Sequence, residues 1–161
     1  MGSQYRALLK LIFKESISIR LWPVMDPFKY CPHGIYGNCS NQPVILVPRA
    51  KNGTWLNPNA TEAQIDSFMD EANNLEVEMI FMSHEFGHHY SDFSGYEEAR
   101  ASFDQSPDST SIEDRERLMN EEAFAWNKAR EIMKGLGYDN WTLFDQLKND
   151  SLGSYRTGYK L

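Results

Sequence analysis

The sequence predicts one α+β domain, mostly helical, with a small antiparallel sheet in its N-terminal half. Three observations lead to this class. A chain of 161 residues is long enough to bury one hydrophobic core. Short apolar segments bounded by prolines, typical of strands, occur in the N-terminal half. Longer segments with apolar residues at helical spacing follow them. Because Met1-Gly2-Ser3 resembles a cloning remnant, we assign the domain to residues 4–161.

The first elements are expected to be a helix, a strand and a loop. Residues 4–16 place their apolar side chains on one helical face. Residues 17–21 alternate apolar and polar side chains, as a half-buried strand does. Residues 26–42 are rich in proline, glycine and asparagine, so we expect no regular structure there.

The sheet is expected to continue with a hairpin. Residues 43–48 form an apolar run between two prolines, which predicts a strand. Asn52-Gly53 is a typical hairpin turn, and residues 54–56 are expected to return beside the first strand of the hairpin. The whole sheet is therefore predicted to contain two to four strands.

Capping patterns divide the rest of the chain into helices. Thr61 and Gln64 predict a capping box, and a second box is expected from Thr110 to Glu113. A helix is predicted from Leu75 to Asp92, with Gly95 just past its end. We expect an interruption at Asn73-Asn74, and largely irregular structure at 94–110 with a turn of helix at 96–103. The second capping box starts a long helix that is expected to end at Gly135 or Gly137. A last helix, capped by Asp139, follows it, and residues 151–161 receive no assignment.

Composition excludes several classes of protein. The net charge of −7, with dispersed acidic residues, argues against a nucleic-acid-binding surface, because phosphate contacts need clustered Lys and Arg. No apolar run approaches the roughly 20 residues that span a bilayer, so we expect no membrane association. Without a visible export signal, we expect a cytoplasmic rather than a secreted protein. Cys31 and Cys39 can be bridged or free, and the sequence does not decide between these states.

The most informative motif is His84-Glu85-Phe86-Gly87-His88. Positions four apart lie on one face of a helix, so the two imidazoles can bind one metal ion. Glu85 then lies beside the open coordination position. Zinc suits this arrangement, because it accepts imidazole nitrogens and keeps one position for water at catalytic sites. We therefore predict a zinc site with Glu85 as its general base.

A catalytic zinc site needs a third protein ligand. His89 points about 100° away from His88, and Asp92 lies about 12 Å along the axis from His84. Glu122 is the one polar residue in a stripe of apolar residues along the long helix. Burying a carboxylate in such a stripe costs free energy unless the carboxylate binds a cation. Its neighbour Glu121 points about 100° away from the stripe and is expected to reach water. We therefore predict Glu122 as the third ligand, with a buried ion pair to Arg115 or Arg100 as the alternative role of that carboxylate.

These residues resemble the gluzincin class of zinc metallopeptidases, in which His-Glu-x-x-His is followed by a Glu on a second helix. The segment Glu122-Ala123-Phe124-Ala125-Trp126 is similar to that of small ImmA/IrrE-type members. The resemblance covers roughly residues 75–136 and implies a zincin-like fold, in which the motif helix packs against the second ligand-bearing helix. Gluzincins often carry an Asp one turn after the ligand Glu, whereas this chain has Trp126. The family's oxyanion-stabilising Tyr or His matches no single position, so Tyr90, Tyr138, Tyr155, Tyr159 and His89 are all candidates.

The expected activity is hydrolysis of peptide bonds in a protein or peptide substrate. Glu85 would take a proton from water and pass it to the leaving amine. An exposed edge of the Val44–Val47 strand could align an extended peptide by strand addition, by analogy with the class. Autoprocessing, cleavage of a regulatory protein and digestion of short peptides are equally open, and the oligomeric state is unknown.

Three alternatives remain from the sequence. A peptide deformylase also uses His-Glu-x-x-His with an upstream Cys ligand, but the residues around Cys39 do not match its Glu-Gly-Cys segment. A non-catalytic zinc-containing interaction or regulatory module would fill the fourth position, for example with Cys31, His33 or Cys39. The third alternative is a helical protein that binds no metal.

Overall fold

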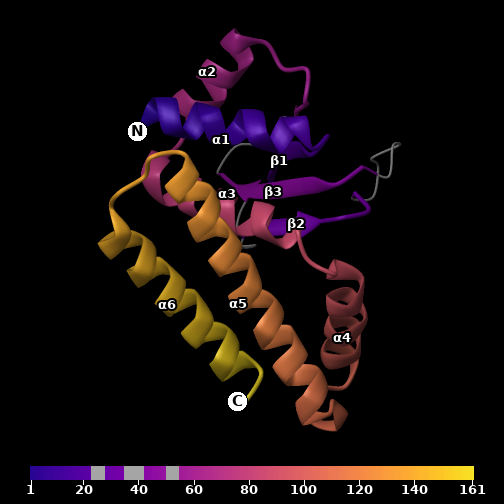
Figure 1. The fold of residues 1–161 in the computed structure, drawn as a ribbon. Helices are drawn as coiled ribbons and strands as arrows, with labels where there is room; N and C mark the ends of the chain where they lie inside the picture. Colours follow the sequence, from indigo (N-terminus) through magenta and orange to yellow (C-terminus); the bar gives the residue numbers. More distant parts are fainter. Residues whose placement is uncertain (23–27, 35–41, 50–54) are drawn as a thin grey trace.

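The computed structural model describes residues 1–22, 28–34, 42–49 and 55–161. Within them the chain forms six α-helices and one four-stranded sheet, which confirms the mostly helical α+β class (Figure 1). The strands are β1 (Ser18–Trp22), β2 (Lys29–Cys31), β3 (Val44–Pro48) and β4 (Trp55–Leu56). The helices are α1 (Gly2–Lys14), α2 (Glu62–Asp70), α3 (Leu75–His88), α4 (Phe93–Gln105), α5 (Ile112–Gly135) and α6 (Trp141–Gly158), with a 3-10 turn η1 (Pro107–Ser109) before α5.

The sheet is mixed, and not antiparallel throughout as the sequence suggested. Its order is β2-β3-β1-β4, and the central pair, β1 and β3, runs parallel. The outer pairs, β2 with β3 and β1 with β4, are antiparallel. A parallel pair needs a connection of a dozen or more residues, and the segment 23–43 between β1 and β3 is long enough to provide it.

Two expectations about strands were wrong. The strand at Trp55–Leu56 exists, but it pairs with β1 and so does not form a hairpin with β3. The expected Asn52-Gly53 turn lies outside the described residues. The segment 26–42 was expected to be loop, yet Lys29–Cys31 forms β2, which closes one edge of the sheet as described.

The helices before the motif follow their sequence signals. α1 buries five apolar side chains on one face, and it begins at Gly2, so the fold includes residues that we had set aside as a remnant. Thr61 and Gln64 form the predicted capping box of α2. Asn74 caps α3 by accepting a hydrogen bond from the Val77 amide at 3.0 Å. The interruption predicted at Asn73-Asn74 is therefore the start of the motif helix.

The segment after the motif differs most from expectation. α3 ends at His88, four residues before Asp92, and Gly95 lies inside α4 instead of capping α3. α4 runs for 13 residues where we expected largely irregular structure. Its inner side packs on α5, with Ala99, Tyr96 and Phe103 in a small core cluster around Leu118 and Tyr159. Packing on α5 therefore stabilises a helix that its own sequence favours weakly.

The two C-terminal helices begin within one residue of their predicted starts, and the last helix is longer than predicted. α5 is capped by Ser111, one residue later than expected, and ends at Gly135 as expected. Asn140 caps α6, one residue after the predicted Asp139. α6 continues to Gly158 and so includes most of the segment that the sequence left unassigned.

α3 and α5 form the centre of the molecule. α5 passes between α6 and α4, and its N-terminal end extends away from the sheet, whereas α1 lies over the sheet (Figure 1). One hydrophobic core joins residues from α1, the sheet, α2, α3, α5 and α6, and Trp126 and Phe86 are fully buried in it. Gly87 on α3 faces the backbone of Ala125 on α5 so closely that a β-carbon there would overlap the Ala125 carbonyl oxygen. The absence of a side chain at Gly87 thus lets the two helices approach.

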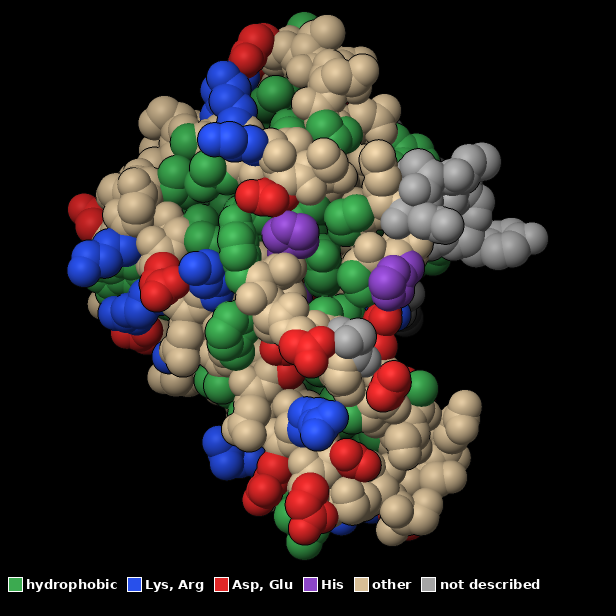
Figure 2. Space-filling view, turned by 45° about the vertical axis from the view of Figure 1, so that its right-hand side comes forward, with side chains coloured by type: hydrophobic (Ala, Val, Ile, Leu, Met, Phe, Trp, Pro, Cys, Tyr) green, Lys and Arg blue, Asp and Glu red, His purple; other side chains and the backbone are tan. Residues whose placement is uncertain are grey.

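The surface mixes charges. On the face drawn in Figure 2, the described acidic and basic side chains are interspersed around patches of apolar side chains. Among the described residues, no helix is both long and apolar enough to cross a membrane.

Candidate metal centre

α3 carries the motif through the interior of the protein. Both its early residues, such as Met79 and Ile80, and its late ones, such as Phe86, are buried. The helix therefore has no solvent-facing stripe along its second half, and the polar side chains of the motif must find partners inside. His84 and His88 are 2% and 3% exposed, with ring centroids 4.9 Å apart, as expected for positions i and i+4 of one helix face.

Glu122 on α5 meets both imidazoles. Its Oε2 lies 3.0 Å from His84 Nε2 and 3.3 Å from His88 Nε2, and its side chain is 1% exposed. One ligand atom from each of the three residues lies within 4.8 Å of the others. Two donors about 2.0–2.1 Å from a tetrahedral ion stand about 3.3 Å apart, so the two distances from Glu122 to the imidazoles fit the coordination sphere of zinc. The structure brings the three predicted ligands together, and their binding of zinc stays a prediction.

Within this cluster, the imidazoles and the carboxylates stabilise each other's charged forms. Burial opposes the charged form of Glu122, but hydrogen bonds from His84 and His88 outweigh it and lower the pKa of this carboxyl. Burial likewise opposes the charged form of His88, while Glu121 and Glu122 raise its pKa. The pocket is thus built to hold positive charge next to carboxylates, which is what a metal ion supplies when it replaces the protons of its ligands.

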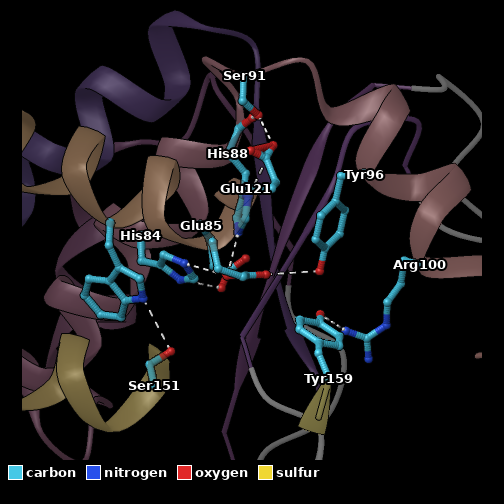
Figure 3. Close-up of polar contacts among 11 residues, drawn as sticks. His84, Glu85, His88, Ser91, Tyr96, Arg100, Glu121, Ser151 and Tyr159 are labelled. Atoms are coloured by element: carbon cyan, nitrogen blue, oxygen red, sulfur yellow. Dashed lines mark hydrogen bonds and ion pairs between the residues drawn. The ribbon is translucent and has the colours of Figure 1, made fainter. Parts of the chain in front are cut away.

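Trp126 takes the place where the resemblance leads to an Asp. Its ring stacks on the His84 imidazole, with centroids 4.4 Å apart and planes at 17°. The indole Nε1 donates a hydrogen bond to Ser151 Oγ on α6 at 3.3 Å (Figure 3). His84 is therefore oriented by stacking and not by a carboxylate on that side.

Glu121 is buried, contrary to the expectation that it reaches water. Its side chain is 8% exposed, and Oε1 lies 3.8 Å from His88 Nδ1, a ring nitrogen that makes no hydrogen bond within the described residues. Ser91 Oγ donates to Glu121 and also lies 2.8 Å from the His88 carbonyl oxygen. The predicted helix phase was right, but the chain after α3 turns back over this side of α5. Glu121 consequently stands behind His88, where a carboxylate can orient a ligating imidazole.

Tyr96 on α4 is a site residue that the sequence analysis missed. Its hydroxyl donates to Glu122 Oε1 at 3.1 Å, so one carboxylate oxygen faces the imidazoles while the other is fixed by Tyr96 (Figure 3). The signal that could have found it is the helical spacing of Tyr96, Ala99 and Phe103 within a segment otherwise read as irregular.

Glu85 is buried next to the triad without belonging to it. Its Oε1 lies 3.1 Å from His84 Nδ1, and its side chain lines a cavity of about 490 Å³ that also reaches His88 and Glu122. Aromatic residues from the sheet, from the position just before β2, and from α4 and α6 form much of the cavity wall: Trp22, Phe28, Tyr30, Phe93, Tyr96 and Tyr155. A substrate entering this cavity would meet Glu85 and the face of the triad together.

Of the five candidates for stabilising an oxyanion, Tyr155 is the one that lines this cavity. Burial, and then the charges of Glu122 and Glu85, raise the pKa of Tyr155, so its hydroxyl stays protonated and able to donate. The other four have partners elsewhere: Tyr138 donates to Glu76, Tyr159 bonds Arg100, Tyr90 lies under Lys128, and His89 contacts Tyr30 and Glu15.

The proposed fourth ligands of a non-catalytic site do not join the triad in the described residues. Cys31 is a free thiol that lines the cavity, but it is not in the group whose ligand atoms lie within 4.8 Å. His33 is exposed and lies 3.5 Å from Glu97. Cys39 lies outside the described residues.

Comparisons of the chain with models of protein families, with curated proteins and with solved structures found no match. The resemblance to gluzincins therefore rests on the two motifs.

Proposed function

We propose that this protein is a zinc-dependent metallopeptidase, with His84, His88 and Glu122 as metal ligands and Glu85 as general base. The main support is the convergence of two imidazole nitrogens and one carboxylate oxygen beside a cavity lined by His88 and Glu122, with a second carboxylate, Glu85, on the same wall. Zinc in such a site supplies a Lewis acid that activates water and polarises a carbonyl.

The chain's own residues supply proton transfer and charge stabilisation. Glu85 accepts the proton of the attacking water and delivers it to the leaving amine, a role for which a carboxylate close to the ion, but not among its ligands, is required. Tyr155 donates a hydrogen bond to the oxygen that becomes negative in the tetrahedral state. Trp126 and Glu121 keep His84 and His88 in their ligating orientations.

The substrate-binding edge differs from the sequence expectation. β3 is paired on both sides, with β1 and with β2, so its edges are not available for strand addition. β2 is at the edge of the sheet within the described residues, and Lys29, Tyr30 and Cys31 line the cavity. A peptide added to β2 would lie along the cavity, with backbone hydrogen bonds setting its direction.

The decisive experiment uses Glu85→Gln. Protein loaded with one zinc per chain is assayed on a library of internally quenched peptides. Glu85→Gln should keep zinc and fold while hydrolysis falls by about 10²- to 10⁴-fold. Glu116→Gln, the same chemical change on the exposed side of α5, is the matched control and should cleave like the parent. Equal rates for Glu85→Gln and the parent would show that the peptidase proposal is wrong.

A further inference from the structure

Apart from the triad and Glu85, the described cavity wall carries more positive than negative side chains. They belong to Lys29 on β2 and to Arg100 and Asp104, one turn apart on α4. Two cations and one anion give a net charge of +1 (2 − 1), although the chain as a whole carries −7. This part of the cavity is therefore suited to an anionic group of a substrate.

Arg100 is held at the wall by hydrogen bonds to two residues. Nη1 donates to Tyr159 Oη at 2.9 Å, and Nε donates to Asp104 Oδ1 at 3.2 Å and Oδ2 at 3.4 Å. Tyr159 is 2% exposed, so the guanidinium is tied to a fixed part of the fold. Figure 3 shows Arg100 and Tyr96 on the opposite side of the site from His84. Within the described residues, none of these hydrogen bonds uses Nη2, which can therefore serve as a donor to a ligand.

Asp104 does not satisfy Arg100 fully. The pair is an i,i+4 contact whose side chains are 42% and 59% exposed, and such pairs contribute little to stability. A guanidinium presents five donors in a planar fork, so a second carboxylate can bind it while Asp104 stays in place. Arg100 is therefore prepared to accept a carboxylate from the cavity side.

We propose that Arg100 binds a carboxylate of the substrate, so that the site selects peptides carrying a carboxylate close to the cleaved bond. The inference rests on the proposed peptidase function and names its substrate class. The carboxylate can belong to an Asp or Glu side chain or to the C-terminus of the peptide, since both present the same group to the guanidinium.

The test uses four versions of one cleaved peptide, chosen from the quenched library. They carry Glu or Gln next to the cleaved bond and a free or amidated C-terminus. We expect at least one carboxylate to raise kcat/KM by about 10- to 100-fold, the range expected for a hydrogen bond to a charged group. Loss of the preference with Gln identifies the side chain as the source, and loss with the amide identifies the C-terminus.

Variants assign the preference to Arg100. Arg100→Gln should abolish the difference in kcat/KM between acidic and neutral peptides, with the larger loss falling on the acidic peptides. Arg6→Gln makes the same charge change at a residue bonded to Glu62 and Asp66 and should keep the preference. Asp104→Asn removes the competing carboxylate and should increase the preference, a gain that general damage to the fold would not produce.

Binding provides a second measurement that does not need turnover. Zinc-loaded Glu85→Gln should bind the labelled acidic peptide more tightly than the neutral one in fluorescence anisotropy, and the added substitution Arg100→Gln should remove that difference. Equal cleavage of all four peptides by the parent, or a preference that survives in Arg100→Gln, would overturn the role of Arg100 and leave the peptidase proposal standing. If the parent cleaves no peptide of the library, the peptidase proposal fails. Equal anisotropy for an acidic library peptide and its Gln-substituted, amidated version would then reject the carboxylate site as well.

Discussion

The two sides of the cavity are built differently. On one side, the seam between α3 and α5 holds His84, His88 and Glu122 at 1–3% exposure, packed among aromatic and aliphatic side chains. On the other, the wall formed by α4 and α6 presents Arg100 and Asp104, half open to water and fixed by a few side-chain hydrogen bonds. The seam is suited to chemistry that needs fixed distances, and the wall to selecting among ligands. Substitutions in the seam should therefore change metal binding and stability, and substitutions in the wall should change rates with the metal unaffected.

The largest effect is expected from removing a ligand in the seam. Glu122→Gln should lower zinc affinity by more than about 100-fold, because loss of a ligand exceeds the effect of losing an outer partner. Competition with a chromogenic chelator measures this affinity. Since a ligand bound to the folded state adds stability, a chelator should lower the Tm of the parent but barely move that of Glu122→Gln. If the chelator does not change the Tm of the parent, the prediction of a tightly bound metal is wrong.

The second-largest effect is expected from a substitution in the cavity wall. Tyr155→Phe removes the proposed donor to the oxyanion and should lower kcat by about 10²-fold, with zinc content unchanged. Tyr138→Phe makes the same change at a tyrosine bonded to Glu76, away from the cavity, and should keep the parent kcat. Loss of zinc from Tyr155→Phe would instead mean that Tyr155 helps to hold the metal. The wall would then affect metal binding as the seam does.

Close approach of the seam helices can be tested at Gly87. Gly87→Ala inserts a methyl group against the Ala125 backbone, so we expect a loss of about 2 kcal/mol despite the better helix propensity of alanine. Gly153→Ala on α6 meets nothing within 4 Å and should stabilise by up to about 1 kcal/mol. Urea denaturation of both variants measures the difference. If both variants are equally stable, the helices are not in contact at Gly87.

The smallest effect is expected from the support behind His88. Glu121→Gln keeps the shape of the side chain but removes its charge near His88 Nδ1, so zinc affinity should fall by about 10-fold. This loss should be clearly smaller than that of Glu122→Gln in the same chelator competition. A larger loss for Glu121→Gln would mean that the two neighbouring glutamates exchange roles when metal binds.

The seam was more predictable from the sequence than the wall, for a physical reason. His84, His88 and Glu122 were located from helix periodicity and from the cost of burying a carboxylate, both of which are local properties of one helix. The structure brings these three residues together as that reasoning required. The burial of Glu121 could not be predicted in this way, because it depends on the chain turning back at Ser91.

The wall depends on contacts between elements, which leave weak signals in one sequence. α4 contains Ser94 and Gly95 near its start and is stabilised by packing on α5. The helix propensity of its residues alone therefore predicts less helix than the structure contains. Strand order likewise depends on long-range pairing: the parallel contact of β1 with β3 follows from a crossover that no local pattern reveals. Tyr96 was therefore missed as a cavity residue, and Arg100 was considered only as a possible ion-pair partner of Glu122.

Two residues of α6 and the residue that caps its C-terminal end, each four positions from the next, reach three different parts of the site. Ser151 bonds the tryptophan behind His84, Tyr155 lines the cavity, and Tyr159 holds Arg100. Because they share one helix face, their relative heights are set by the helical rise of about 6 Å per four residues. In the proposed enzyme, the register of α6 against α5 would thus set the depth at which the ends of a substrate lie relative to His84, His88 and Glu122. A shift of this one helix along its axis would then change the proposed metal support, catalysis and substrate choice together.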